Sequence, residues 1–399
     1  MAKKILIIDD SALMRRVISD IINEGNEYEV AAVARDGLEG FDKIVSNPNM
    51  YSAVILDINM PKMNGLELLK KLQQNNISQT VIVVSTVAKE GARETIQALE
   101  YGAFDFVTKP ENYLETKSEQ FKKRIHEMLD VATNTRESRE RVAKASSSPL
   151  RNTNTLKTTG LSSKTIANKS STSGLASTTN RPLRSSSSQT TVSKVSASQY
   201  SGVKKGKQKL VALACSTGGP KSLQSVIPML PKNLDAGIVL VQHMPAGFTA
   251  SLAQRLDEMS EISVKEAADG DIINKGHVYI APGGRHIKVM KEGANYVIRL
   301  NDAPAIDGLR PCANVMYDSL QNTSFDEITC VVLTGMGADG TNGIKGLAAS
   351  KKNIHVIAQD EQTCVVYGMP KALALTGLVN EVVPLGKVAE AITKNVGVS

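Results

Sequence analysis

The sequence predicts an α/β protein with two doubly wound, largely parallel sheet domains that are joined by a disordered linker. Apolar strand patterns alternate with amphipathic helix patterns in two separate stretches of the chain, which is the signature of βαβ units. A stretch rich in serine and threonine separates them. We place the first domain at residues 1–125, the linker at 126–206 and the second domain at 207–399.

The first domain shows five short apolar runs, each followed by a helical pattern. We expect strands at residues 5–8, 30–34, 53–56, 81–84 and 104–107. Helical crossovers between successive strands favour a parallel sheet, and five strands favour the flavodoxin-like strand order.

The linker is set apart by its composition. Residues 142–206 contain 27 Ser or Thr, ten Lys or Arg and no Asp or Glu. So few apolar side chains cannot offset the entropy cost of ordering the segment, so we expect a flexible tether. Without it, the net charge of the chain falls from +7 to about −3. We therefore expect no specific nucleic-acid partner. Residues 126–141, rich in Arg and Glu, are expected to extend the last helix of the first domain.

The second domain repeats the alternation. We expect strands at residues 210–215, 238–242, 277–281, 329–334 and 353–358, with helices at 221–229, 249–259, 342–349 and 387–393. Residues 287–290 and 296–300 flank a turn and predict an antiparallel hairpin. The pattern indicates a Rossmann-like α/β domain with an antiparallel edge.

Several features point to a cytoplasmic protein that is not inserted in a membrane. No run of about 18 uncharged apolar residues is present. The apolar run at residues 5–8 is too short for a signal peptide and ends in two acids. The four cysteines are far apart and form no C-x-x-C pair, so disulfides and a structural zinc site are not expected.

Polar residues follow several strands of the first domain. Asp9 and Asp10 follow the first strand, and Asp57 ends the third. Carboxyl ends of parallel strands share one edge, where three carboxylates would repel one another without a hard cation such as Mg²⁺. Thr86 and Lys109 follow strands four and five and offer a hydroxyl and a positive charge to a phosphoryl group. Taken alone, each acid has a simpler explanation as a helix cap.

Residues 1–115 resemble response-regulator receiver domains. The matching motifs are Asp9-Asp10-Ser11, Asp57 with Met60-Pro61 and Gly65, Thr86, and Thr108-Lys109-Pro110. The resemblance implies that Asp57 accepts a phosphoryl group from a chemotaxis histidine kinase. It also implies a Mg²⁺ site formed by Asp9, Asp10, Asp57 and the carbonyl of Asn59. The residues that it implies for phosphoryl contacts and switching are Thr86, Phe106 and Lys109.

Three polar residues of the second domain also follow apolar strands: Ser216, His243 and Asp339. Taken separately, each has a plainer explanation. The turn at Ser216 could bind phosphate or simply be tight, His243 could be a structural imidazole, and Asp339 could be an acid in a glycine turn. Together at one sheet edge, they supply a nucleophile, a base and an orienting carboxylate. Their order along the chain differs from that of the α/β-hydrolases.

Residues 209–395 resemble the chemotaxis protein-glutamate methylesterases. The resemblance rests on residues 216–219, 242–245, 279–283, 333–337 with 339–340, and 364–370. It implies that Ser216, His243 and Asp339 are catalytic, that Thr217 and the amide of Met336 help to form an oxyanion hole, and that this domain needs no cofactor. Cys312 and Asn314 depart from the family pattern. We expect these two departures to affect local packing or substrate contacts, and not the triad.

The two resemblances together imply a phosphorylation-activated hydrolase. Its expected substrates are glutamate methyl esters, and selected glutamines, of methyl-accepting chemotaxis receptors, whose demethylation gives sensory adaptation. The alternative is a response regulator with a non-catalytic or nucleotide-binding effector domain. A DNA-binding effector would require a helix-turn-helix, and a nucleotide site lacks a Walker lysine and an acid after the second strand.

Overall fold

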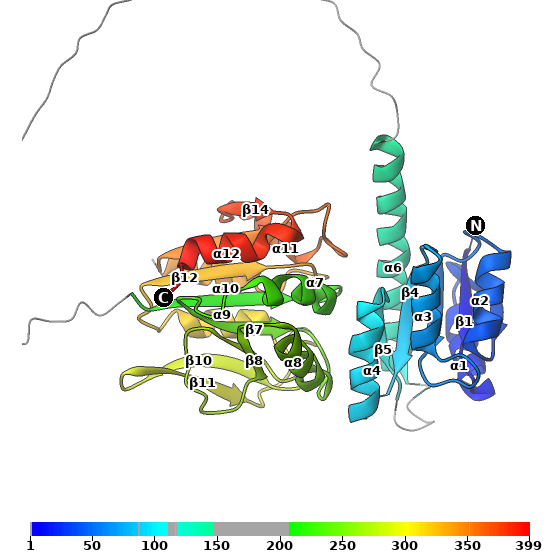
Figure 1. Ribbon diagram of the computed structural model, residues 1–399, viewed down its shortest axis with the longest axis horizontal. Helices are drawn as coiled ribbons and strands as arrows, with labels where there is room; N and C mark the ends of the chain where they lie inside the picture. Colours follow the sequence, from blue (N-terminus) through cyan, green and yellow to red (C-terminus); the bar gives the residue numbers. More distant parts are fainter. Residues whose placement is uncertain (1, 87, 111–115, 117, 147–206, 351) are drawn as a thin grey trace, which may run out of the picture. The chain divides into compact units, whose positions relative to one another are not determined.

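The computed structural model describes residues 2–86, 88–110, 116, 118–146, 207–350 and 352–399. Met1–Lys144 and Lys207–Ser399 belong to one compact unit. Residues 147–206, which form most of the predicted linker, lie outside the described residues. Two parallel sheets with helices on both faces are seen within the unit, so the predicted fold class is confirmed (Figure 1).

The first sheet has the order β2-β1-β3-β4-β5, which is the predicted flavodoxin-like order. All of its pairs are parallel. Its strands are β1 (Lys3–Ile8), β2 (Tyr28–Ala34), β3 (Ala53–Asp57), β4 (Val81–Ser85) and β5 (Asp105–Thr108). The helices are α1 (Ala12–Asn23), α2 (Gly37–Ser46), α3 (Gly65–Gln74), α4 (Lys89–Glu100) and α6 (Glu119–Ser146).

Helix α6 crosses the predicted domain boundary. It begins before residue 126 and continues to Ser146, so the expected helical extension over 126–141 is confirmed. The boundary that we placed at residue 125 therefore falls inside a helix. The apolar stripe on its first turns, which includes Phe121 and Ile125, packs against Ile5 and Ile7 of β1. This packing explains why the helix begins as part of the first domain.

Strand β1 of the first sheet is apolar on both faces because helices cover both sides. Ile5 and Ile7 contact the cluster that contains α1 and α6, whereas Leu6 and Ile8 contact the one that contains α2, α3 and α4. Successive side chains of a strand point to opposite faces. An unbroken apolar run such as residues 5–8 is therefore what a strand covered on both faces requires.

The second sheet has seven parallel strands in the order β14-β13-β12-β6-β7-β9-β8. They are β6 (Lys209–Cys215), β7 (Gly237–Gln242), β8 (Ser263–Glu266), β9 (His277–Ile280), β12 (Glu327–Val332), β13 (Ile354–Gln359) and β14 (Glu381–Val383). The predicted hairpin is confirmed as the antiparallel pair β10 (His286–Glu292) and β11 (Asn295–Asn301). The two edge strands, β8 and β14, were not predicted, because they are short and largely polar or exposed.

Helices cover both faces of the second sheet. Val211, Leu213 and Cys215 of β6 face the cluster that contains α7 (Gly219–Val226), α8 (Phe248–Met259) and α12 (Val388–Val396). The alternate residues Leu210 and Ala212 face the cluster that contains α9 (Ala313–Leu320), α10 (Thr341–Ala349) and α11 (Met369–Ala374). Short 3₁₀ helices lie at Ile227–Met229 and Leu385–Lys387.

The strand order of the second sheet reverses between β6 and β12. From β6 the chain places β7 beside it, then β8 at the far edge and β9 between β7 and β8, and it then returns to place β12 on the other side of β6. In open parallel sheets, ligands bind beyond the carboxyl ends of the strands at such a reversal, because the loops on either side diverge there. The topology therefore places the candidate site at the ends of β6, β7 and β12.

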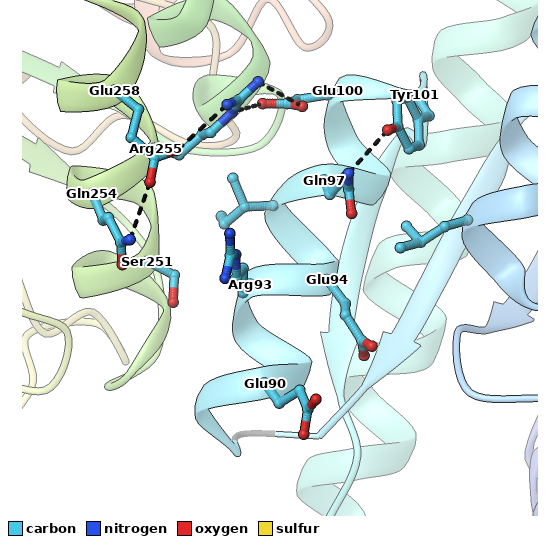
Figure 2. A pocket seen from close by; sticks show the side chains of 12 residues that line it. Glu90, Arg93, Glu94, Gln97, Glu100, Tyr101, Ser251, Gln254, Arg255 and Glu258 are labelled. Atoms are coloured by element: carbon cyan, nitrogen blue, oxygen red, sulfur yellow. Dashed lines mark hydrogen bonds and ion pairs between the residues drawn. The ribbon is translucent and has the colours of Figure 1, made fainter.

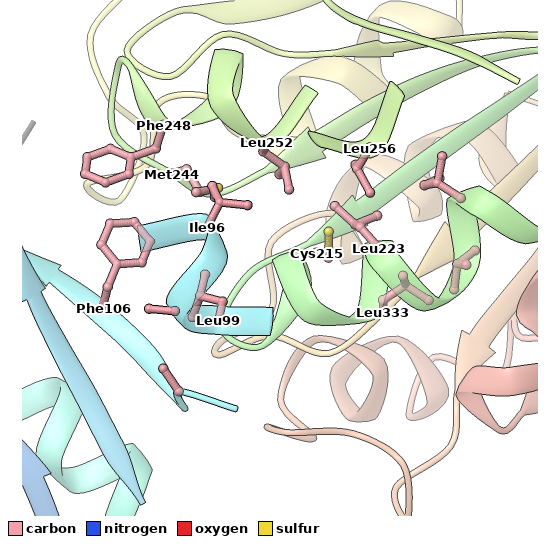
Figure 3. Close-up of a cluster of buried hydrophobic side chains, with 14 of the residues drawn as sticks. Ile96, Leu99, Phe106, Cys215, Leu223, Met244, Phe248, Leu252, Leu256 and Leu333 are labelled. Atoms are coloured by element: carbon pink, nitrogen blue, oxygen red, sulfur yellow. The ribbon is translucent and has the colours of Figure 1, made fainter. Parts of the chain in front are cut away.

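Two kinds of contact join the first domain to α8. The Phe106 ring of β5 packs against the Phe248 ring, with ring centroids 4.6 Å apart (Figure 3). Arg255 of α8 forms an ion pair with Glu100 at the end of α4, beside a cavity of about 530 Å³ (Figure 2). Apolar side chains of both domains, among them Ile96 and Leu252, share one buried cluster.

Candidate functional site

The acidic residues of the first domain meet at the carboxyl end of its sheet. Ligand oxygens of Asp9, Asp10 and Asp57 lie within 4.8 Å of one another. The Lys109 ammonium lies 3.0 Å from Asp9 Oδ2 and 2.9 Å from Asp57 Oδ1. The structure therefore brings together four groups from the ends of β1, β3 and β5. Three hard carboxylate oxygen donors at this spacing fit a small divalent cation.

Burial sets the protonation of this cluster. Desolvation raises the pKa of Asp57, although the Lys109 charge opposes the shift. Burial alone would lower the pKa of Lys109, but the two carboxylates outweigh it and the pKa is raised. Lys109 therefore remains a cation and partly neutralises a site that carries excess negative charge.

The other predicted residues of this domain surround the cluster without contacting it directly in the described structure. Thr86 follows β4 and its side chain is exposed. The Asn59 amide donates to Glu94 at 3.0 Å, so its side chain points away from the carboxylates. Phe106 is buried against Phe248.

The second domain brings Ser216, His243 and Asp339 to one edge of its sheet. Ser216 is the first residue after β6, His243 the first after β7, and Asp339 lies in the loop after β12. His243 Nε2 lies 2.8 Å from Asp339 Oδ2. Ser216 and His243 line the same cavity of about 320 Å³, together with Thr217 and Met336.

The hydroxyl of Ser216 makes no hydrogen bond to His243 among the described contacts. Because Nε2 is occupied by Asp339, Nδ1 is the ring nitrogen that remains to accept a proton from this hydroxyl. Catalytic hydrogen bonds are often long before substrate binds and shorten in the reacting complex. Both residues line the same cavity, although only 8% of the His243 side chain is exposed.

Asp339 lies at the amino terminus of α9. Its Oδ2 accepts from the Ala313 amide at 2.6 Å, and its Oδ1 accepts from the amides of Asn314 and Gly340, both at 2.9 Å. Burial opposes ionisation, but His243 and the backbone donors outweigh it and lower the pKa of Asp339 to about 2. The carboxylate is thus charged at any working pH, as a partner for an imidazolium must be.

The two departures from the family pattern contact Asp339 directly, and the contact between His243 and Asp339 is nevertheless made. The Cys312 thiol lies 3.2 Å from Asp339 Oδ1, and Asn314 donates its backbone amide to the same oxygen. Burial raises the pKa of the Cys312 thiol to about 12, so it stays protonated and can donate. Sequence spacing gave no signal of this, because 27 residues separate Cys312 from Asp339.

The turn that carries Ser216 depends on close backbone approach. Ser216 N donates to Thr334 O at 3.0 Å, which fixes the turn against the loop after β12. A Cβ atom on Gly335 would lie 2.8 Å from Ser216 Cβ, so only glycine fits there. Thr217 and Met336 therefore lie on the two loops that flank the nucleophile candidate.

A carboxylate of the first domain also reaches this cavity. Asp105 at the start of β5 lines it and is buried. Burial raises the pKa of Asp105 to about 6, against hydrogen bonds from the Phe106 amide, the Thr217 hydroxyl and the Gly218 amide. Sequence reasoning did not single out Asp105.

Gln242 is a second residue that we did not single out. It ends the strand β7, whose other residues are all apolar, and its side chain is buried. A lone amide at the end of such a strand, directly before a candidate base, was the available signal.

Two family models and several known proteins match this chain. Residues 211–392 match the CheB methylesterase family model, and residues 5–118 match the response regulator receiver domain. A protein-glutamate methylesterase/protein-glutamine glutaminase of Pyrococcus horikoshii is 39% identical over 394 residues, covering 98% of this chain and 93% of the relative. The protein of that name from Bacillus subtilis is 38% identical over 399 residues, covering 98% and 97%.

One solved structure is similar to part of this chain. The crystal structure of the Thermotoga maritima CheB methylesterase catalytic domain is 43% identical, covers 47% of this chain and 99% of that one, and has a TM-score of 0.46. Within the described residues, no helix combines the length and the apolar character needed to cross a bilayer. The match to the two relatives extends over nearly the whole chain. This protein therefore belongs to the protein-glutamate methylesterase/protein-glutamine glutaminase family and combines a response regulator receiver domain with a CheB methylesterase domain.

Proposed function

We propose that Ser216 is the nucleophile of this hydrolase, that His243 is its general base and acid, and that Asp339 orients the imidazole. The observation that carries the proposal is the 2.8 Å contact between His243 and Asp339 at the cavity that Ser216 lines. A serine hydroxyl is a weak nucleophile until a base takes its proton, and the base needs a carboxylate to hold one tautomer. These three residues supply those groups.

The reaction follows from this arrangement. Ser216 Oγ attacks the ester carbonyl while its proton moves to His243 Nδ1, and Asp339 stabilises the imidazolium. Thr217 and the Met336 amide flank the nucleophile and would donate to the oxyanion. The proton on His243 then passes to the leaving methoxide, which departs as methanol. Water, deprotonated by His243, then attacks the acyl-enzyme; the bond from the acyl carbon to Ser216 Oγ breaks, the proton on His243 returns to Ser216 Oγ, and the glutamate carboxyl group is left free. With a glutamine side chain, ammonia leaves instead.

The proposed substrates are glutamate methyl esters, and selected glutamines, on methyl-accepting chemotaxis receptors. The names of the relatives support this assignment, since both state methylesterase and glutaminase activity on protein side chains. The proposed phosphodonor is a chemotaxis histidine kinase. No specific nucleic acid is proposed as a partner. A location in the cytoplasm remains a prediction from the sequence.

In the receiver domain we propose that Asp57 accepts the phosphoryl group and that Asp9, Asp10, Asp57 and the Asn59 carbonyl hold Mg²⁺. The carboxylate cluster supports the metal assignment. The ion, when bound, would neutralise charge on the phosphoryl oxygens. Lys109 and Thr86 would bind those oxygens, and Lys109 already contacts both Asp9 and Asp57.

Control of the hydrolase by the receiver is supported by the residues that line the cavity. Asp105 and Phe106 of β5 lie beside Ser216 and Thr217 in it. Phosphorylation that moves β5 would change access to the nucleophile, with Phe106 as the switch residue.

Methanol release from methylated receptor membranes, with and without a small phosphodonor, tests the function. Ser216→Ala should abolish release and leave phosphorylation of Asp57 intact. Ser225→Ala is the matched control, because this serine lies exposed on α7. Turnover that persists in Ser216→Ala would remove this residue from the proposed role.

A further inference from the structure

The Gln242 side chain lies between the proposed nucleophile and the proposed base. Cys215 and Gln242 are register partners at the ends of the parallel strands β6 and β7. Ser216 directly follows β6, and His243 directly follows β7. The distance between the two catalytic groups therefore depends on how these two strand ends are held together.

The carboxamide of Gln242 bonds to the backbone of both residues. Its Nε2 donates to Ser216 O at 3.0 Å and to His243 O at 3.1 Å. Only 2% of the Gln242 residue surface is exposed, so water does not compete for these bonds. Both hydrogens of the amide nitrogen are used, one for each carbonyl.

The orientation of this amide is fixed by its neighbours. Carbonyl oxygens only accept, so the NH₂ group must face Ser216 O and His243 O, and Oε1 must face the Cys215 thiol at 3.1 Å. Burial raises the pKa of Cys215, so this thiol stays protonated and can donate. The flipped orientation would lose both bonds to the carbonyl oxygens. A buried polar group whose bonds are all made favours a single conformation.

We propose that Gln242 is a positioning residue for catalysis, whose amide holds the main chain at Ser216 and at His243 in one fixed relation. The inference rests on the proposed function. No described side-chain bond joins Ser216 to His243. Before substrate binds, their spacing therefore depends on the main chain, where His243 N donates to Cys215 O at 3.1 Å and the Gln242 amide links the carbonyls of Ser216 and His243. An error of about 1 Å in such a spacing can lower a rate by about 10²-fold.

Gln242→Met is the sharpest substitution, because it keeps the side-chain volume and removes both donors. The readout is the rate at which a fluorophosphonate reagent labels Ser216 in the full-length chain, followed by intact-protein mass spectrometry. All variants are compared with the same saturating phosphodonor. We expect labelling to slow by about 10- to 100-fold, and we expect the KM for methylated receptors to change by less than about threefold while kcat falls, since uniform binding is kept.

A double-mutant cycle with His243→Ala separates positioning from simple destabilisation. If Gln242 acts by aligning Ser216 with His243, its loss should matter little once the imidazole is absent, and the second slowing should be less than about threefold. The same slowing in both backgrounds would overturn the proposal, as would a wild-type rate in Gln242→Met.

Asn395→Leu is the control for loss of a partly buried amide. Asn395 lies on α12, and its amide donates to Glu327 Oε1 at 2.8 Å and to Thr329 Oγ1 at 2.7 Å, at the start of β12 and away from the turn that carries Ser216. Any slowing in this variant should be equal with and without His243. A slowing that disappears in His243→Ala would show that buried amides in general have this effect, and would overturn the specific role of Gln242.

Gly219→Ala tests the same amide without removing it. A Cβ atom at residue 219 would lie 2.0 Å from Gln242 Oε1, so the carboxamide must shift. We expect slower labelling in this variant even though alanine favours the helix that begins there. An unchanged rate would count against the proposal. Failure of the proposed function would be seen in a different measurement, namely methanol release that persists in Ser216→Ala.

Discussion

Replacing Asp339 with asparagine should disrupt the candidate triad while leaving the fold in place. The carboxylate accepts on both oxygens: Oδ2 from Ala313 N and His243 Nε2, and Oδ1 from two backbone amides and the Cys312 thiol. Asparagine has one carbonyl oxygen and one NH₂ group. Whichever way it turns, the NH₂ group faces backbone donors. If the NH₂ group takes the place of Oδ2, it faces His243, whose Nε2 must then accept a hydrogen bond. The neutral imidazole would carry its proton on Nδ1 instead. Nδ1 could then no longer accept the proton of Ser216.

The magnitude follows from the lowered pKa of Asp339. A fall from 3.8 to about 2 corresponds to about 2–3 kcal/mol in favour of the ionised form in the folded protein. Only 9% of the Asp339 residue is exposed, so screening by solvent reduces this free energy only slightly. We expect Asp339→Asn to lower the free energy of unfolding of the second domain by about 2–3 kcal/mol at pH 7, and to lower kcat by about 10³- to 10⁴-fold.

The effect of pH on the free energy of unfolding follows from the lowered pKa of Asp339. A carboxyl whose pKa is lowered by folding stabilises the protein above about pH 4, and this contribution is lost as the pH falls towards 2. The difference between wild type and Asp339→Asn in urea unfolding, followed by circular dichroism, should therefore shrink below pH 4. Asp318→Asn is the control, because Asp318 lies on α9, whose first amides donate to Asp339, and is exposed. A wild-type kcat in Asp339→Asn, or a stability difference that is constant from pH 7 to pH 3, would refute the reasoning.

Three further outcomes concern the receiver domain. Asp57→Asn should abolish stimulation of methanol release by a phosphodonor and leave the unstimulated rate within about twofold, since Asp57 lies outside the hydrolase cavity; stimulation that survives would contradict the phosphoacceptor assignment. Chelation of divalent cations should block phosphorylation of Asp57 without changing unstimulated release, and an equal loss of both would place a metal requirement in the hydrolase. Phe106→Ala removes the ring contact with Phe248, so the unstimulated rate should rise by about 2- to 10-fold, and an unchanged rate would argue against Phe106 as a barrier.

The sequence by itself determined the two sheets and the positions of the chemically active residues along the chain. Strands with unbroken apolar runs, such as residues 5–8 and 238–241, were found because burial on both faces leaves a strong local pattern. The edge strands β8 and β14 were missed because half-exposed strands leave only a weak apolar pattern in the sequence.

Only the tertiary structure decided which polar groups contact one another. Cys312 and Asp339 are 27 residues apart, and Gln242 and Ser216 are 26 apart, yet each pair lies within bonding distance. The first contact arises because α9 begins beside the loop that follows β12, and the second because β6 and β7 end side by side in parallel register. Periodicity is a local property of the chain, and it carries no information on which strand ends become neighbours in space.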